Sequence, residues 1–296
     1  MNPGVAVTVY AAAKVNLYLH VLGRRADGYH LVDSLVAFVD ICDHIIAEPA
    51  AALSLEVNGP EAAGLQPVRD DNLVLQAARL LADRAGIAAG AALRLKKNLP
   101  VAGGLGGGSS DAAAALLALR KLWELLISDE ALRELGAGLG ADVPACLYRD
   151  AVWVGGIGER LEPAGALPEA GILLANPRQP LLTAAVFAAR HGPFGKAARF
   201  APMPSDAAGL ADALSLRRND LTEAAIGRVP EIETVLARLG GLPGARLPRM
   251  SGSGATCFAL FDDRSAAATA RARLAAAEPS WWCAAGGFLA GAGLCD

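Results

Sequence analysis

The sequence is poor in several residue types, and each scarcity excludes a class of protein. Its 296 residues include five cysteines, an odd number, with no Cys-x-x-Cys pair and no histidine at a metal-ligand spacing. A disulfide scaffold or zinc module is therefore not expected, and buried thiols in a reducing compartment are the simpler interpretation. Neither sign of charge dominates, since 27 Lys and Arg face 30 Asp and Glu, a net charge of −3. A nonspecific nucleic-acid binder would show a basic surplus, so we expect no nucleic-acid partner.

Long hydrophobic runs are also missing. Residues 1–5 lack the positive stretch and apolar core of a signal peptide. The longest apolar stretch, 281–294, is broken by glycine and is shorter than the ~20 residues that a membrane span needs. We therefore expect a cytoplasmic protein without membrane contact. The sequence does not show the oligomeric state, for which a monomer or weak homodimer is the expectation. Lysine is scarce as well, with five among the 27 basic residues, so an isolated lysine among small residues attracts attention.

What the sequence does contain, 53% hydrophobic and 19% charged residues, can fill a large core. Strands are expected at 5–10, 17–22, 34–46, 92–95, 152–154, 172–175, 257–261 and 282–289. Helices are expected from 73 to Gly86, where Asp70, Asp71 or Asn72 can cap the start, from 112 to 123, and after the cap Ser128. Further helices are expected at 183–189, 221–226, 232–239 and 265–276. This mixed order predicts an α+β protein rather than a doubly wound sheet. A proline-interrupted stretch at 162–171 suggests two domains, 1–165 and 166–296.

The most unusual segment is the glycine-rich loop, residues 100–111, which reads PVAGGLGGGSSD and enters an alanine- and leucine-rich helix. Ser109, Ser110 or Asp111 is available to cap that helix. Unpaired N–H groups and the helix dipole attract anions there, and glycines let an anion approach, so phosphate is the expected ligand. A flexible turn is the alternative. The segment matches neither of two common phosphate loops. The P-loop has a lysine after its glycines, which is missing here, and a strict GxGxxG motif ends in glycine where this chain has Ser109.

Other candidate side chains lie outside the loop. Lys14, between two expected strands, is either a solvated lysine or one that neutralises phosphate charge beside a carboxylate. Asn16 should point to the same side of its strand. Asp142, before Val143-Pro144, either caps a helix or acts as a base toward a hydroxyl group. After the Asp27-Gly28 turn, Tyr29 and His30 form either a plain hairpin or an aromatic face and hydrogen-bonding edge for cytosine.

The glycine-rich loop, P-x-x-x-G-L-G-G-G-S-S-D-A-A, resembles the phosphate-binding motif of the GHMP kinases. Further blocks of that family are similar in order and spacing, and they extend from end to end of the chain: residues 13–17, 25–30, 140–144 and 251–256. The Gly28-Tyr29-His30 block resembles the branch of the family whose substrate is 4-diphosphocytidyl-2-C-methyl-D-erythritol. Residues 219–221 also match, and we interpret them as helix capping.

The resemblance implies a two-domain GHMP kinase fold with its active site in the cleft between the domains. It implies transfer of the γ-phosphoryl group of ATP, with Mg²⁺, to the 2-hydroxyl of that substrate in the non-mevalonate route to isoprenoid precursors. Lys14 and Asp142 become the catalytic pair, and the expected substrate contacts are Asn16, Tyr29, His30, Thr183 and Phe187, the last closing a stack on cytosine. ATP is assigned to Pro100, Val101, Ala102, Gly103, Gly104, Leu105, Gly106, Gly107, Gly108, Ser109 and Ser110.

Three alternatives stay open. A GHMP kinase for homoserine or mevalonate would share most of the blocks, although Gly-Tyr-His counts against it. A catalytically silent ATP-binding sensor would share the fold, although Lys14 and Asp142 are both present. A glycine- and alanine-rich domain that binds no nucleotide is the third. The sequence does not identify ligands for Mg²⁺.

Overall fold

The computed structural model describes residues 5–68, 72–88 and 90–289, and within them the strands form two sheets. The first comprises β1 (Val7–Arg24), β2 (His30–Ala50), β3 (Ser54–Asn58), β4 (Gly90–Lys96), β5 (Val152–Gly155) and β6 (Arg160–Pro163). The second comprises β7 (Gly171–Asn176), β8 (Arg246–Met250), β9 (Cys257–Phe261) and β10 (Trp282–Gly287). The first sheet runs in the order β3-β4-β2-β5-β6, with β1 also paired to β2, and the second in the order β10-β7-β9-β8.

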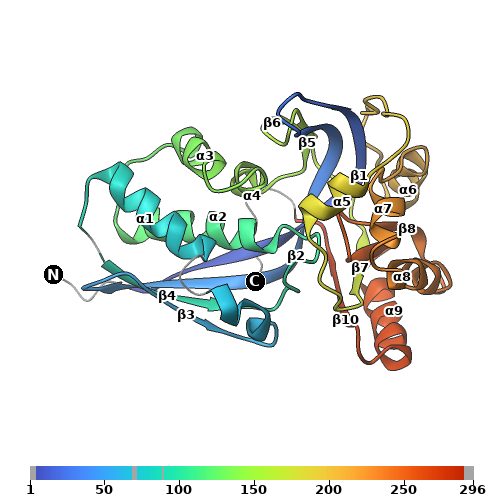
Figure 1. The fold of residues 1–296 in the computed structure, drawn as a ribbon. Coiled ribbons are helices and arrows are strands. Elements are labelled where there is room, and N and C mark those ends of the chain that lie inside the picture. The colour runs from blue at the N-terminus through green and yellow to red at the C-terminus, as the bar shows by residue number, and fades with distance from the viewer. Residues whose placement is uncertain (1–4, 69–71, 89, 290–296) are drawn as a thin grey trace.

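The helices divide between the two sheets. The first group is α1 (Leu73–Ala85), α2 (Gly107–Leu122), α3 (Asp129–Ala137) and α4 (Val143–Tyr148), with a 3₁₀ helix at Ala62–Val68. The second is α5 (Thr183–Ala189), α6 (Ala207–Ser215), α7 (Thr222–Ile226), α8 (Glu231–Gly240) and α9 (Arg264–Ala277). Figure 1 shows α1–α4 gathered over one side of the first sheet and α6–α9 beside the second. The predicted α+β class is confirmed.

The strand β1 is continuous, whereas the sequence analysis placed a gap between two strands at residues 11–16. That prediction was wrong because tertiary contacts override the weak strand preference of alanine. Ala13, Val15 and Leu17 are fully buried, and β1 pairs with β2 along its length, with register shifts near Ala12 and Asn16. Lys14 and Asn16 therefore lie on a strand, on its opposite face from those apolar residues.

Helix ends follow local chemistry in most places. Asn72 caps α1 and Ser128 caps α3 with their side chains, and Gly86 ends α1 in a left-handed conformation. The neighbouring cap candidates at 70–71 lie outside the described residues. At α2 the prediction was wrong, because the cap is Gly106 and residues 109–111 lie inside the helix. The glycines accept the turn without a side-chain cap, which frees Ser110 to bond elsewhere.

Several elements were not predicted, namely β3, β6 and the 3₁₀ helix beside the first sheet, and α6 and β8 in the second half. Helix α6 follows Asp206, whose side chain accepts a hydrogen bond from the Gly209 N–H, a cap that the sequence could have revealed. Strand β8 contains Pro248 and lies at a sheet edge, where proline is tolerated. Along the chain, the last strand of the first sheet, β6, ends at Pro163, and the first strand of the second sheet, β7, begins at Gly171. Within the described residues, no helix is long and apolar enough to cross a membrane.

Candidate active site

The side chains singled out from the sequence meet in one cleft of about 850 Å³, a size typical of small-molecule sites. Its walls come from β1, β2, the glycine-rich loop, the start of α4, and α5. Every candidate outside the loop lines it, namely Lys14, Asn16, Tyr29, His30, Asp142, Thr183 and Phe187. Of the loop, it is lined by Ala102, Gly103, Gly104, Gly106, Gly107, Gly108 and Ser109.

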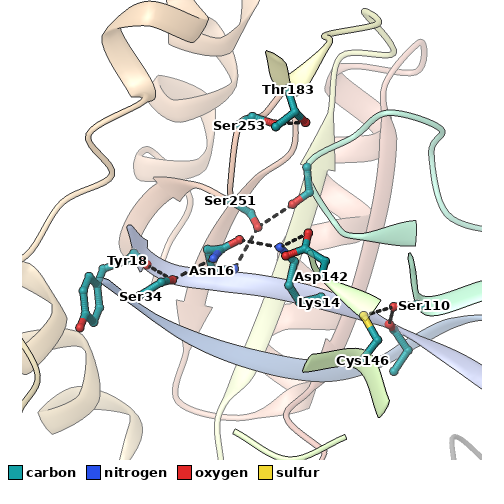
Figure 2. Close-up of polar contacts among 12 residues, drawn as sticks. Lys14, Asn16, Tyr18, Ser34, Ser110, Asp142, Cys146, Thr183, Ser251 and Ser253 are labelled. Atoms are coloured by element: carbon teal, nitrogen blue, oxygen red, sulfur yellow. Dashed lines mark hydrogen bonds and ion pairs between the residues drawn. The ribbon is translucent and has the colours of Figure 1, made fainter. Parts of the chain in front are cut away.

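Four loop residues assigned to ATP do not line the cleft, namely Pro100, Val101, Leu105 and Ser110. Leu105 packs in the core with 1% of its surface exposed. The Ser110 hydroxyl donates to the Ala12 carbonyl at 2.8 Å and lies 3.2 Å from Cys146 Sγ (Figure 2). These two side chains therefore support the loop from behind.

Lys14 and Asp142 form an ion pair across the cleft. Lys14 Nζ lies 2.9 Å from Asp142 Oδ2 and 3.0 Å from Asn16 Oδ1 (Figure 2). The lysine side chain is 6% exposed and the aspartate side chain 45%. Asp142 does stand at the N-terminus of α4, with Pro144 in the first turn, but its carboxylate makes no capping hydrogen bond. The carboxylate is therefore held by the lysine and open to a ligand.

A chain of hydrogen bonds orients this pair. Asn16 accepts from Lys14, and its Nδ2 donates to Ser34 Oγ at 2.8 Å, while Ser34 donates to the Tyr18 carbonyl. These bonds leave the Asn16 amide a single orientation. Ser34 was missed by the sequence analysis, although a serine within the apolar strand 32–39 was a usable signal.

A second set of bonds ties the site to residues 250–256, the small-residue block. The Asn16 N–H donates to Ser251 Oγ at 3.1 Å, and the Ser251 hydroxyl donates to the Gly104 carbonyl at 3.0 Å (Figure 2). Asn219 Nδ2 donates to the carbonyls of Met250 and Gly252. Capping was therefore an incomplete interpretation of Asn219, which holds this block in place; the cap residue of α7 is Leu221.

Gly104 packs against the small-residue block so closely that a side chain has no room. Its φ is +76°, and an added Cβ would lie 2.6 Å from the Ser251 carbonyl oxygen and 2.7 Å from that of Gly254. Both contacts are to backbone, which cannot rotate away. The glycine is thus needed for contact between the loop and the block, as well as for any approach of phosphate.

We expect Gly104→Ala to destabilise the protein more than Gly86→Ala, a matched control. Gly86 also has a positive φ, +64°, but an added Cβ there meets nothing within 4 Å. The left-handed conformation costs about 1–2 kcal/mol at either position, and the clash at Gly104 adds about 1–3 kcal/mol. Urea denaturation of both variants measures the difference. Equal losses would show that the loop does not press on this block.

The far end of the cleft carries aromatic rings. His30 and Phe187 stack with centroids 5.2 Å apart and planes inclined by 30°, and Tyr29 is 60% exposed on the neighbouring turn. In this structure Phe187 therefore lies against His30. Burial, and then Arg24 and Arg190, lower the pKa of His30, so its neutral ring offers one donor and one acceptor at pH 7. Thr183 and Ser253 hydroxyls lie 2.9 Å apart nearby (Figure 2).

The described residues that line the cleft offer few ligands for magnesium. Its lining carboxylates are Asp27 and Asp142, and Asp142 is already paired with Lys14. No group of three His, Cys, Asp or Glu among the described residues could hold a metal ion. Magnesium generally relies on phosphate oxygens and water with one or two carboxylates, so any Mg²⁺ here would enter with a phosphorylated substrate.

Comparison with known proteins agrees with this geometry. The model of the GHMP kinases N terminal domain matches residues 72–150, and that of GHMP kinases C terminal matches residues 197–280. The 4-diphosphocytidyl-2-C-methyl-D-erythritol kinase of Paramagnetospirillum magneticum is 52% identical over 277 residues, 94% of this chain and 96% of the relative. The enzyme of that name from Rhodospirillum rubrum is 52% identical, covering 93% of this chain and 90% of the relative.

Solved structures lead to the same family. A crystal structure of 4-(cytidine 5'-diphospho)-2C-methyl-D-erythritol kinase matches with a TM-score of 0.77 at 34% identity, covering 96% of this chain and all of that one. Homoserine kinase from Cytophaga hutchinsonii, at 17% identity and a TM-score of 0.69 over 96% of this chain and 94% of that one, shares the fold alone. The chain belongs to the GHMP kinases and, within them, to the 4-diphosphocytidyl-2-C-methyl-D-erythritol kinase family.

Proposed function

We propose that this chain transfers the γ-phosphoryl group of ATP to the 2-hydroxyl of 4-diphosphocytidyl-2-C-methyl-D-erythritol, in the non-mevalonate pathway of isoprenoid precursor synthesis. The observation that carries the proposal is the Lys14–Asp142 pair, joined at 2.9 Å in a cleft that the glycine-rich loop also lines. Two relatives that are 52% identical to this chain are named as that kinase.

The proposed step divides between the two charged side chains. Asp142 accepts the proton of the 2-hydroxyl as its oxygen bonds to the γ-phosphorus, and the bond from that phosphorus to ADP breaks. Lys14 faces the transferring group and offsets its negative charge. The N–H groups at the start of α2 hold the phosphates, and Mg²⁺ bound with ATP would offset further negative charge on them. Asn16, which bonds Lys14, keeps the ammonium aimed at Asp142.

We assign the aromatic end to the cytosine ring. Tyr29 supplies an exposed face, and neutral His30 supplies a donor and an acceptor to the edge of the base. Phe187, against His30, offers a second apolar face and keeps that histidine in position. The domain boundary at 165/166, the cytoplasmic location and the monomeric or weakly dimeric state stay predictions from the sequence.

We expect Phe187→Ala to raise the KM for the cytidine substrate about 5- to 150-fold, the equivalent of about 1–3 kcal/mol of lost stacking. The KM for ATP should change little, because the glycine-rich loop is a separate part of the cleft. Steady-state kinetics with each substrate varied in turn measures both constants. Phe194→Ala is the matched control, since Phe194 is half exposed and does not line the cleft. An unchanged KM in Phe187→Ala would contradict the assignment.

ADP release from Mg-ATP tests the function itself. It should require 4-diphosphocytidyl-2-C-methyl-D-erythritol and should be absent with homoserine, with mevalonate and without an acceptor. Release with homoserine or mevalonate instead would place the chain with another GHMP kinase activity. ATP binding without release on any acceptor would make it a silent sensor.

A further inference from the structure

Three charged side chains lie buried behind the glycine-rich loop, and the proposed mechanism uses none of them. Lys97 follows β4, Asp43 belongs to β2 and Asp111 to α2, and each is at most 2% exposed. Lys97 Nζ lies 2.5 Å from Asp43 Oδ2 and 2.7 Å from Asp111 Oδ2. We call these three residues the buried triad.

The buried triad lies directly beneath the residues that would hold phosphate. A Cβ added to Gly107, the first residue of α2, would lie 3.1 Å from Lys97 Nζ. Gly107 itself lines the cleft. Charges here act through protein rather than water, so their effect on a bound anion is only weakly screened.

The formal charge of the buried triad opposes anion binding. One ammonium and two ionised carboxylates sum to one negative charge, placed behind a loop that must accept a triphosphate. A proton on one carboxyl group would bring the sum to zero. Lys97 keeps its charge, because Asp111 and Asp43 outweigh the effect of burial and raise its pKa.

The hydrogen bonds indicate which carboxyl holds the proton. Asp43 accepts from Lys97 and from the N–H groups of Asn98 and Leu99, an environment suited to an ionised carboxylate. Asp111 Oδ2 accepts from Lys97, and Asp111 Oδ1 is buried without a hydrogen-bond partner. A neutral carboxyl group tolerates such a position far better than a charged one.

The surrounding groups favour the same assignment. Burial raises the pKa of Asp111 to about 8, Lys97 opposes this shift, and Asp43 adds to it. From α4, Cys146 also faces this region, with Lys14 and Asp142 acting on it from the cleft. Burial raises the pKa of Cys146 to about 12, so the thiol stays neutral and adds no charge.

We infer that Asp111 holds a proton whenever ATP occupies the glycine-rich loop, so that the buried triad carries no net charge beneath the triphosphate. The inference rests on the proposed function, since ATP is taken as the ligand. Where the free protein already holds this proton, binding needs no uptake. At alkaline pH, where Asp111 ionises in the free protein, binding must take a proton from solvent, so the Kd for ATP should rise by up to about tenfold per pH unit.

Calorimetric titration of the full chain with ATP and Mg²⁺, without acceptor, tests this at pH 8.5. Two buffers of different ionisation enthalpy give the number of protons taken up. The variant Asp111→Asn imitates the protonated carboxyl group. We expect the wild type to take up about half a proton or more per bound ATP in excess of the number that this variant takes up. Between pH 7 and 9 the Kd of this variant should stay nearly constant. Asp83→Asn, on the exposed side of α1, is the matched control and should behave as wild type.

The outcomes separate the two claims. ATP binding with equal proton uptake in the wild type and Asp111→Asn would overturn the inference and leave the proposed function standing. No ATP binding by folded wild type would contradict both. If Asp111→Asn does not fold, the pH dependence of proton uptake by the wild type tests the inference without it. Proton uptake that rises between pH 7 and 9.5 would support the inference, and uptake independent of pH would overturn it.

Discussion

Replacing Asp142 by asparagine is expected to lower kcat by about 10²- to 10⁴-fold, the usual contribution of a positioned general base. Asparagine keeps the size of the side chain and an acceptor for Lys14 Nζ, which lies 2.9 Å from the carboxylate. It cannot take the proton of the substrate hydroxyl. The KM for ATP should therefore change little, and a single-turnover measurement of phosphoryl transfer should slow by the same factor as kcat.

This test needs two controls. Asp150→Asn, a carboxylate that does not line the cleft, is the control and should keep wild-type kcat. Thermal unfolding should show Asp142→Asn folded, because that carboxylate makes no capping bond to α4. If kcat of folded Asp142→Asn stayed within about threefold of wild type, Asp142 would not be the base.

Replacing Lys97 by methionine is expected to reduce the free energy of unfolding by about 3–5 kcal/mol, the usual cost of removing one partner from a buried charge cluster. Asp43 and Asp111 would be left in the interior without their shared cation, at most 2% exposed. This loss is a large part of the stability of an ordinary domain. Urea denaturation measures it.

The neighbouring lysine provides a matched control for that experiment. Lys96 is exposed, so Lys96→Met should change stability by less than about 0.5 kcal/mol. Adding Asp111→Asn to Lys97→Met should restore little of the loss at neutral pH, because Asp111 is already uncharged there and Asp43 is the carboxylate left without its cation. Equal stability of Lys97→Met and Lys96→Met would contradict the role of the buried triad.

Much of the architecture could be predicted from local patterns. Asn72, Gly86 and Ser128 mark helix ends by chemistry that acts within a few residues, and the structure confirms all three. The alternation of a strand placed Lys14 and Asn16 on one side, as the bond between them confirms. Such rules succeed because both partners lie close together in the sequence.

The remaining features depend on contacts between distant segments. Strand β1 is continuous because its alanines are buried against other elements, and the local strand preference of alanine does not predict such burial. Ser251 bonds Asn16 from 235 residues away, and the buried triad joins β2, the end of β4 and α2. The sequence was enough to identify the segments that line the cleft. The hydrogen bonds that orient Lys14 could be found only from the three-dimensional structure.

The proposed reaction is tested most directly by the structure of its product, determined by ³¹P and ¹H NMR after incubation of the protein with Mg-ATP and 4-diphosphocytidyl-2-C-methyl-D-erythritol. We expect a new phosphomonoester on the 2-hydroxyl, an intact diphosphate and one ADP formed per product, with almost no product from Asp142→Asn in the same time. A phosphate on another hydroxyl, or ATP split to inorganic phosphate without a phosphorylated product, would contradict it.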